Sequence, residues 1–159
     1  MEFTGSQTIA ATREQVWNGL NDAAVLQACV PGCEEFVAQN DDEYKAVVVA
    51  SVGPVKARFK GTLLLSDRDG PNGYKILGQG EGGIAGFGKM TATVTLADAD
   101  EGGTLLTYVA DAQVGGKLAQ IGSRLVTSVA NKLAAEFFKR FNATMSAGSA
   151  TSADAGAAR

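Results

Sequence analysis

One apolar stripe near the C-terminus constrains the fold of this chain more than any other feature. Apolar side chains recur every three or four residues over residues 117–145, a spacing that places them on one side of an α-helix. The segment contains no proline, and its single glycine, Gly122, lies near the start. At about 1.5 Å per residue, the predicted helix is roughly 40 Å long. Its stripe consists of Leu118, Ile121, Leu125, Val129, Leu133, Phe137, Phe141 and Met145.

The residues before this helix alternate between apolar and polar side chains, as short strands do. The clearest example covers residues 55–66, and short turns between successive segments predict antiparallel pairing. Thr12 and Gln15 form a capping-box pattern and Asp22 is a second N-cap, which predicts two short helices after the first strand. We therefore predict an α+β fold in which a curved antiparallel sheet of about seven strands wraps around the long C-terminal helix.

Length and composition are those of one globular domain. We predict that it covers residues 1–146 and that residues 147–159, which lack bulky apolar side chains, form a disordered tail. The sequence contains no apolar run of membrane-spanning length and no secretory leader, so a cytoplasmic location is expected, with Cys29 and Cys33 reduced. A net charge of −3 argues against nucleic-acid binding.

The residue types that usually carry catalysis or bind metals are scarce. The chain has no histidine, which removes the commonest general base and metal ligand. Cys29 and Cys33 form a C-x3-C pair without the second pair that a structural zinc site needs. The sequence GQGEGG at residues 78–83 matches a dinucleotide fingerprint, but a threonine-rich strand follows it where a helix is required. We expect neither a catalytic residue nor a metal site.

Two surface features have two open interpretations each. The glycines of residues 78–88 suit a wide, irregular hairpin, and Ile84 and Phe87 at its tip either contact a membrane or partner, or fold inward. The long helix carries five basic residues and one acidic residue. Its basic residues either form a solvated outer face or meet an anionic membrane or partner, for which Lys132, Lys139 and Arg140 are the candidates.

Inward-facing strand positions combine aromatic side chains with small ones. Gly61, Ala92, Ala110 and Ala112 leave space that large side chains would otherwise fill, so either an apolar cavity or a filled core lies between sheet and helix. An aromatic or isoprenoid ligand would suit such a cavity. The predicted lining residues are Phe59, Leu63, Leu65, Tyr74, Ile76, Phe87, Val94, Leu106, Tyr108, Leu118, Ile121, Leu125 and Val129.

Several segments in the same order resemble the CoxG family, the accessory proteins of carbon monoxide dehydrogenase. They include MEFTGS at 1–6, VPGCE at 30–34, GPVKARFKG at 53–61, the glycine-rich residues 78–88 and VGGKLAQIGSRL at 114–125. Together they span residues 1–146. The resemblance implies the helix-grip (START-like, SRPBCC) fold, which agrees with the architecture predicted from the residue pattern.

The resemblance also implies a non-enzymatic accessory protein. Its partner would be a carbon monoxide dehydrogenase-type molybdenum hydroxylase, which it would bring to the inner face of the cytoplasmic membrane. A bound quinone or other isoprenoid lipid in the cavity would serve as electron acceptor. Two alternatives remain: an adaptor for hydroxylase assembly with a filled core, or a cyclase or dehydratase, for which Tyr74, Tyr108 and Glu81 are the only candidate groups.

Overall fold

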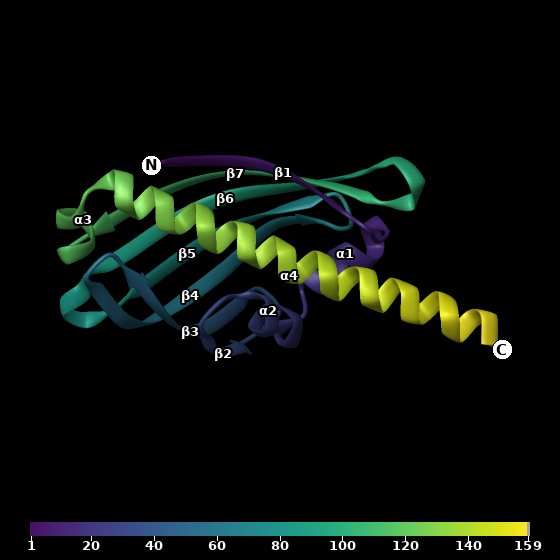
Figure 1. Ribbon diagram of the computed structural model, residues 1–159, viewed down its shortest axis with the longest axis horizontal. Helices are drawn as coiled ribbons and strands as arrows, with labels where there is room; N and C mark the ends of the chain where they lie inside the picture. Colours follow the sequence, from purple (N-terminus) through teal and green to yellow (C-terminus); the bar gives the residue numbers. More distant parts are fainter. Residues whose placement is uncertain (159) are drawn as a thin grey trace.

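The computed structural model is a seven-stranded, wholly antiparallel sheet curved around one long helix (Figure 1). It describes the backbone of residues 1–158 and the side chains of residues 1–147. The strand order is β1-β7-β6-β5-β4-β3-β2, which makes β1 and β2 the sheet edges. The strands are β1 (Glu2–Ile9), β2 (Cys33–Ala38), β3 (Glu43–Val52), β4 (Val55–Asp69), β5 (Gly73–Glu81), β6 (Phe87–Asp98) and β7 (Thr104–Gly115). The predicted fold class is confirmed.

Two short helices, α1 (Arg13–Leu20) and α2 (Ala23–Cys29), follow the first strand as predicted. The Thr12 hydroxyl accepts a hydrogen bond from the Gln15 amide at 3.2 Å, and Gln15 Oε1 accepts one from the Thr12 amide at 3.0 Å. Asp22 Oδ1 accepts from the Ala24 amide at 3.0 Å. These bonds pair amides that the first helical turn leaves free, so the local sequence is enough to fix where both helices begin.

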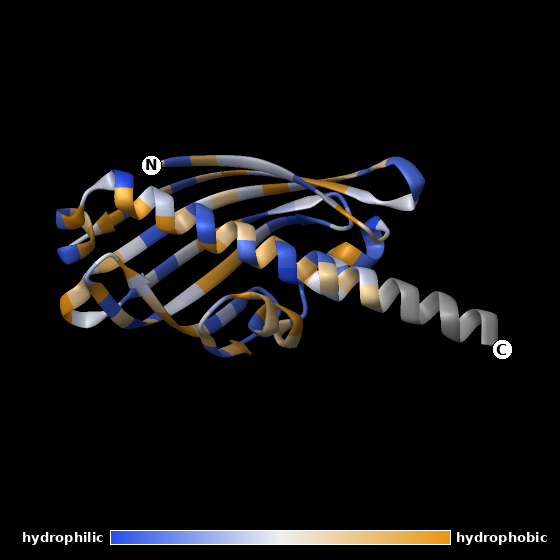
Figure 2. Ribbon diagram, viewed as in Figure 1, coloured by the Kyte–Doolittle hydropathy of each residue, from blue (hydrophilic) through white to orange (hydrophobic). Residues whose placement is uncertain are grey.

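The long C-terminal helix lies across the concave face of the sheet (Figure 1). Hydrophobic and hydrophilic residues alternate along the strands beneath it (Figure 2), and burial follows the same alternation in β4 and β6. Every second side chain therefore faces the helix, as a period of two requires. Short 3-10 turns, η1 (Gly83–Ala85) and η2 (Asp100–Gly102), close the β5–β6 and β6–β7 hairpins.

One prediction about the helix is wrong: residues 117–145 do not form a single helix. The chain forms α3 (Lys117–Ile121), breaks at Gly122 and continues as α4 (Ser123–Ala158). Gly122 has φ +102°, ψ 147°, a backbone conformation that only glycine adopts readily. The apolar period continues through this break, so periodicity alone does not reveal it.

The glycine-rich hairpin is also narrower than predicted. Gly78 and Gly80 belong to β5, and the loop proper is confined to residues 82–86. Gly80 pairs with Gly61 of β4 in the ladder. A Cβ on Gly61 would lie 2.6 Å from the Gln79 carbonyl oxygen, so the glycine there permits a close approach of two strands.

The bounds of α4 extend into the segment predicted to be a disordered tail, residues 147–159. The side chains after residue 147 lie outside the described residues, so that prediction stays a prediction. Among the described residues, no helix is both long and apolar enough to cross a membrane.

Candidate functional site

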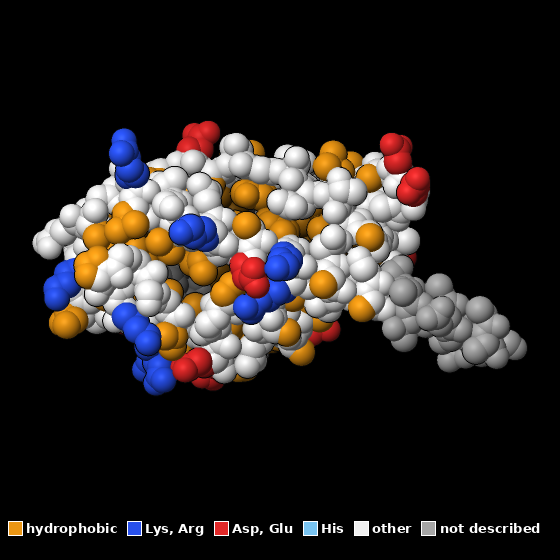
Figure 3. All heavy atoms as spheres, in the orientation of Figure 1, with side chains coloured by type: hydrophobic (Ala, Val, Ile, Leu, Met, Phe, Trp, Pro, Cys, Tyr) orange, Lys and Arg blue, Asp and Glu red, His pale blue; other side chains and the backbone are white. Residues whose placement is uncertain are grey.

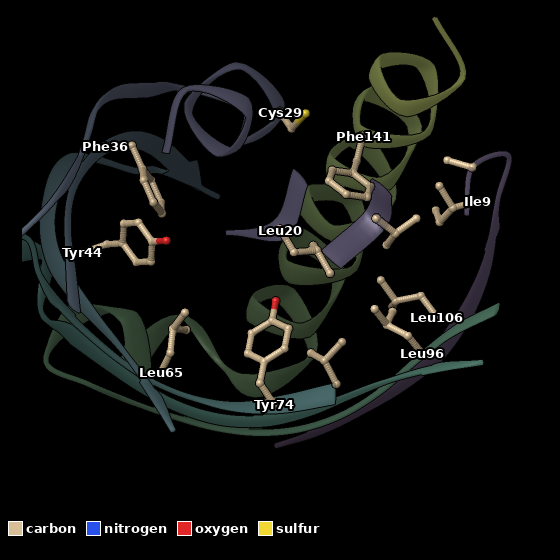
Figure 4. Packing of buried hydrophobic residues seen from close by; sticks show 13 residues of the cluster. Ile9, Leu20, Cys29, Phe36, Tyr44, Leu65, Tyr74, Leu96, Leu106 and Phe141 are labelled. Atoms are coloured by element: carbon tan, nitrogen blue, oxygen red, sulfur yellow. The ribbon is translucent and has the colours of Figure 1, made fainter. Parts of the chain in front are cut away.

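The buried side chains between the sheet and the helices form two separate clusters. The larger cluster lies where α1, α2 and α4 meet the sheet, and Phe141, Val16 and Leu106 are almost wholly buried within it (Figure 4). The smaller cluster consists of Val52, Leu118 and Val126, at the end of the sheet where α3 lies. The hydrophobic core of this protein is therefore not continuous along α4.

A band of small, half-buried residues separates the two clusters. The inner faces of the strands carry Gly61, Ala92 and Ala112 there, next to Ala46 at the edge of the larger cluster. Ala134 is half-buried on the facing helix. Leu133 of α4 remains 36% exposed. Figure 3 shows the surface hollowed beside α4, with hydrophobic side chains at the rim of the hollow. Apolar side chains of this kind remain partly exposed when nothing from the chain itself packs against them.

Most residues predicted to line a ligand site face this space or one of its ends. Leu65, Tyr74, Val94 and Leu106 belong to the larger cluster, with Leu63, Ile76 and Tyr108 packed against it. Leu118 belongs to the smaller cluster, with Phe59, Ile121 and Val129 packed against it. The structure thus brings eleven of these residues to the inner side of the sheet, each of them within or packed against one of the two clusters.

Phe87 is an exception, because it lies on the outer face of the sheet. It is 55% exposed and belongs to the outward-facing phase of β6. Its ring lies over Gly115, its cross-strand partner in β7, where no side chain competes for the space. The predicted role of Phe87 in an inner lining is therefore wrong, while its exposure is compatible with a surface contact.

Leu125 is also more exposed than the stripe predicts. It is 37% exposed on the first turns of α4, and its side chain reaches toward Gly53 in the β3–β4 hairpin. The neighbouring Val126 is buried in the smaller cluster instead, together with Leu118 of α3.

The end of the sheet near α3 combines exposed apolar side chains with backbone that only glycine tolerates. Ile84 in η1 is 85% exposed, and α3 packs against η1 (Figure 1). Gly116 has φ +68° and Gly122 has φ +102°, so glycines bound the five-residue α3 on both sides. The predicted apolar tip at Ile84 is thus fully presented to solvent.

Three aromatic side chains and one amide meet at the other end, beneath α1. The Trp17 and Tyr74 rings meet edge to face with centroids 5.4 Å apart. The Tyr44 hydroxyl donates to the Asn21 carbonyl oxygen at 3.0 Å, and Asn21 Nδ2 donates to the Trp17 carbonyl oxygen at 2.9 Å. Sequence reasoning missed this group, because Trp17 and Asn21 look like ordinary helix residues until the sheet brings Tyr44 and Tyr74 against them.

Burial governs the electrostatics of this group. It raises the pKa of the Tyr74 phenol well above its ordinary value, and the neighbouring Tyr44 raises it further. Burial also raises the pKa of Tyr44. Both phenols are therefore neutral over the physiological range and act only through hydrogen bonding and packing.

The candidate polar groups for an enzyme are not gathered in one place. Glu81 is exposed on the outer face of the sheet, whereas Tyr74 and Tyr108 face inward. Tyr108 stacks on Phe138 with ring centroids 5.5 Å apart. Within the described residues, no three His, Cys, Asp or Glu side chains are grouped as metal ligands.

Two grooves lie on the outer face of the sheet, opposite α4. The larger has a volume of about 750 Å³ and is bordered by side chains such as Lys45, Lys60 and Glu81. The smaller, about 570 Å³, lies over β5, β6 and β7 beside Lys75 and Asp111. Their mixed charge does not suit an apolar ligand, and neither groove is the predicted site.

The basic residues of α4 lie on its outward side, as predicted. Lys132, Lys139 and Arg140 are exposed, and Arg140 pairs with Glu136 at 3.0 Å. Among the described side chains, neither Lys132 nor Lys139 has a carboxylate within ion-pair distance. This surface is separate from the exposed Ile84 at the α3 end.

Comparisons with solved structures support the fold. A conserved protein from Geobacillus kaustophilus is 34% identical over 91% of this chain and 95% of its own, with a TM-score of 0.85. A START superfamily protein from Mycobacterium smegmatis has a TM-score of 0.68 at 13% identity, covering 91% of this chain and 96% of its own. The Zhui aromatase/cyclase from Streptomyces sp. R1128 has a TM-score of 0.67 at 13% identity, covering 91% and 93%.

A search of curated proteins found no match. The family model for CoxG, described as a subunit of carbon monoxide dehydrogenase, matches residues 5–146, which are nearly all of the residues whose side chains the structure describes. Together with the START-like architecture of the sheet and helices, this match shows that the chain belongs to the CoxG family.

Proposed function

We propose that this protein is a non-enzymatic carrier of a lipophilic ligand, a quinone or related isoprenoid lipid, that couples a carbon monoxide dehydrogenase-type molybdenum hydroxylase to the membrane. The observation that carries the proposal is the divided core, in which half-buried apolar residues lie between two packed clusters. An apolar ligand would complete this core. Membership of the CoxG family supports the choice of partner.

The energetics of burial favour a ligand of this class. Each methylene group moved from water to an apolar environment contributes about 0.8 kcal/mol, so an isoprenoid chain gains affinity from length alone. The inner residues offer few polar groups, which suits a ligand that is mostly hydrocarbon. Exposed Ile84 and Phe87 at the α3 end would touch the bilayer, and the protein would act as a peripheral protein at the inner face of the cytoplasmic membrane.

Native mass spectrometry followed by solvent extraction and lipid analysis tests ligand binding directly. We expect a lipid of the quinone or isoprenoid class to co-purify with the protein. The variant Ala92→Phe, which fills the inner face of β6, should lose this lipid. Thr93→Phe places the same ring on the outer face of the same strand and should retain it. Retention of the full lipid content by Ala92→Phe, or its absence from the wild-type protein, would contradict the proposal.

A pure adaptor function has one observation in its favour, the exposed basic surface of α4, where Lys132 and Lys139 have no ion-pair partner among the described side chains. Substituting Lys132, Lys139 and Arg140 together by Glu should abolish co-purification with the hydroxylase, because a basic surface of this kind suits an acidic partner. Under our proposal this variant keeps its lipid. Two results together would favour the adaptor: the wild-type protein carries no lipid, and Ala92→Phe binds the hydroxylase as well as the wild-type protein does.

A further inference from the structure

The inner face has a polar end, and its hydrogen bonds are incomplete. Asn21 Oδ1 is buried without a hydrogen-bond partner, and it is the one such side-chain atom among the described residues. The orientation of the amide is fixed, because Nδ2 donates to the Trp17 carbonyl oxygen at 2.9 Å and a flipped amide would set two acceptors against each other. This acceptor therefore needs a donor that the described chain does not supply.

The Tyr74 hydroxyl lies in the same part of the fold. Tyr74 is only 6% exposed, and no hydrogen bond of its hydroxyl is found among the described residues. In Figure 4 the hydroxyl groups of Tyr74 and Tyr44 both point inward from the sheet, that of Tyr74 toward Leu20. Leu20 precedes Asn21, and the rings of Tyr74 and Trp17 are in contact.

The third polar atom is the Tyr44 hydroxyl oxygen, which can accept a hydrogen bond but has no proton left to donate. The Tyr44 hydroxyl hydrogen is used in the bond to the Asn21 carbonyl oxygen, so its lone pairs can only accept. The group as a whole offers two acceptors, Asn21 Oδ1 and Tyr44 Oη, and one hydroxyl, that of Tyr74, which can donate or accept. Ala46 and Ile76 follow Tyr44 and Tyr74 by two residues on the same face of β3 and β5, and both are only half-buried. The polar group therefore borders the space between the two clusters.

This donor and acceptor count selects among ring substituents. A ring carbonyl is only an acceptor, so Tyr74 alone could serve it and Asn21 Oδ1 would stay unpaired. A ring hydroxyl can donate to Asn21 Oδ1 and accept from Tyr74 at the same time. Leaving a buried acceptor unpaired costs more than a single exposed hydrogen bond contributes, so the difference between the two substituents is large.

We infer that Asn21, Tyr44 and Tyr74 form a subsite for the hydroxyl of an apolar aromatic ring, so that a hydroquinone binds more tightly than the corresponding quinone. This inference rests on the proposed function, because it specifies which form of a quinone-class ligand the protein holds. The ring would lie among half-buried apolar residues such as Ile76, with its hydroxyl directed to the α1–α2 junction.

The test compares the two redox forms of one compound by isothermal titration calorimetry under argon. Duroquinone and durohydroquinone are suitable probes, because the fully substituted ring cannot alkylate Cys29 or Cys33. We expect the wild-type protein to bind durohydroquinone about tenfold more tightly, the effect of one additional hydrogen bond to a buried acceptor.

Asn21→Ala should remove this preference by weakening durohydroquinone binding about tenfold, while duroquinone binding stays within about twofold and shows that the site is intact. Asn142→Ala is the matched control, because the Asn142 side chain also bonds the backbone, with Oδ1 accepting from the Ala10 amide at 3.0 Å, but lies away from this group. Its preference should equal that of the wild-type protein.

Equal affinity of the wild-type protein for the two forms, or an unchanged preference in Asn21→Ala, would overturn the subsite. Failure of both probes to bind would overturn it as well. If a lipid still co-purifies in those cases, the carrier function stands and only the subsite is refuted. If no lipid co-purifies either, the proposed function fails with it.

Discussion

The two ends of the space under α4 are built differently. At the α1–α2 end, Phe138 stacks on Tyr108, Phe137 stacks on Phe141, and the rings of Phe137 and Phe138 meet edge to face. Phe141 is wholly buried. At the α3 end, a three-residue cluster is covered by a five-residue helix between two glycines. The first end, which we call the sealed end, is closed by packed aromatic rings, whereas the second is closed by the short helix α3. We therefore expect the proposed ligand to enter at the α3 end.

The largest expected difference between the ends is in stability. Phe141→Ala should lower the free energy of unfolding by about 3–5 kcal/mol, because it leaves a cavity in the larger cluster. Leu118→Ala in α3 should cost less, about 2 kcal/mol, since α3 can shift toward the smaller space. Urea denaturation of both variants measures the difference. A greater loss for Leu118→Ala would show that the α3 end is the more tightly packed one.

The exposed tip at the α3 end should matter for membrane contact and not for folding. Ile84→Asp should change the free energy of unfolding by less than about 0.5 kcal/mol, because the side chain is exposed. It should reduce sedimentation with anionic lipid vesicles about tenfold or more, since an apolar contact is replaced by a charge that anionic lipid repels.

Val109→Asp is the control for this experiment. It makes the same kind of change at a 51% exposed apolar residue on the outer face, and vesicle binding should not change. If the two variants lose vesicle binding equally, or if Ile84→Asp loses none, the α3 end is not the end that contacts the membrane.

Alkaline pH should weaken the sealed end selectively. Burial raises the pKa of Tyr74 above its ordinary value of 10.0, so above that pH the unfolded state loses the phenol proton before the folded state does. The free energy of unfolding is therefore unaffected by Tyr74 ionisation below pH 10. Above pH 10 it falls by up to about 1.4 kcal/mol for each pH unit. Tyr74→Phe should therefore lose less stability between pH 9 and pH 11 than the wild-type protein.

Thermal melts across that range measure the effect, which should amount to a few degrees, roughly 2–4 °C, in Tm. Tyr108→Phe provides the comparison, since Tyr108 is only half-buried. Identical pH profiles for the wild-type protein and Tyr74→Phe would show that the sealed end admits solvent.

The smallest effect concerns the two free thiols. Cys29 is wholly buried beside Thr144, whereas Cys33 is half-buried in β2, and burial raises the pKa of both thiols. Iodoacetamide at neutral pH should label Cys33 first and Cys29 only after denaturation, because the thiolate is the reactive form and must be accessible. Mass spectrometry of the labelled peptides decides this. Early labelling of Cys29 would mean that α2 and α4 separate readily.

Much of the architecture could be predicted from local sequence. The side-chain period of two predicts the strands, and the hydroxyl of Thr12 and the carboxylate of Asp22 determine where the short helices begin, because each bonds amides only two or three residues away. Short turns then force antiparallel pairing. The inward direction of residues such as Leu63 and Tyr74 follows from the same period.

The candidate site depended on contacts between residues far apart in sequence. Three features result from where strands and helices meet, which no local period encodes. They are the break at Gly122, the exposure of Phe87 over Gly115 and the pairing of Gly61 with Gly80. The unpaired oxygen of Asn21 also arises only when β3 and β5 pack beneath α1. The period of the sequence determined most of the side chains that face inward, and tertiary packing decided which of them the chain covers and which stay half-buried.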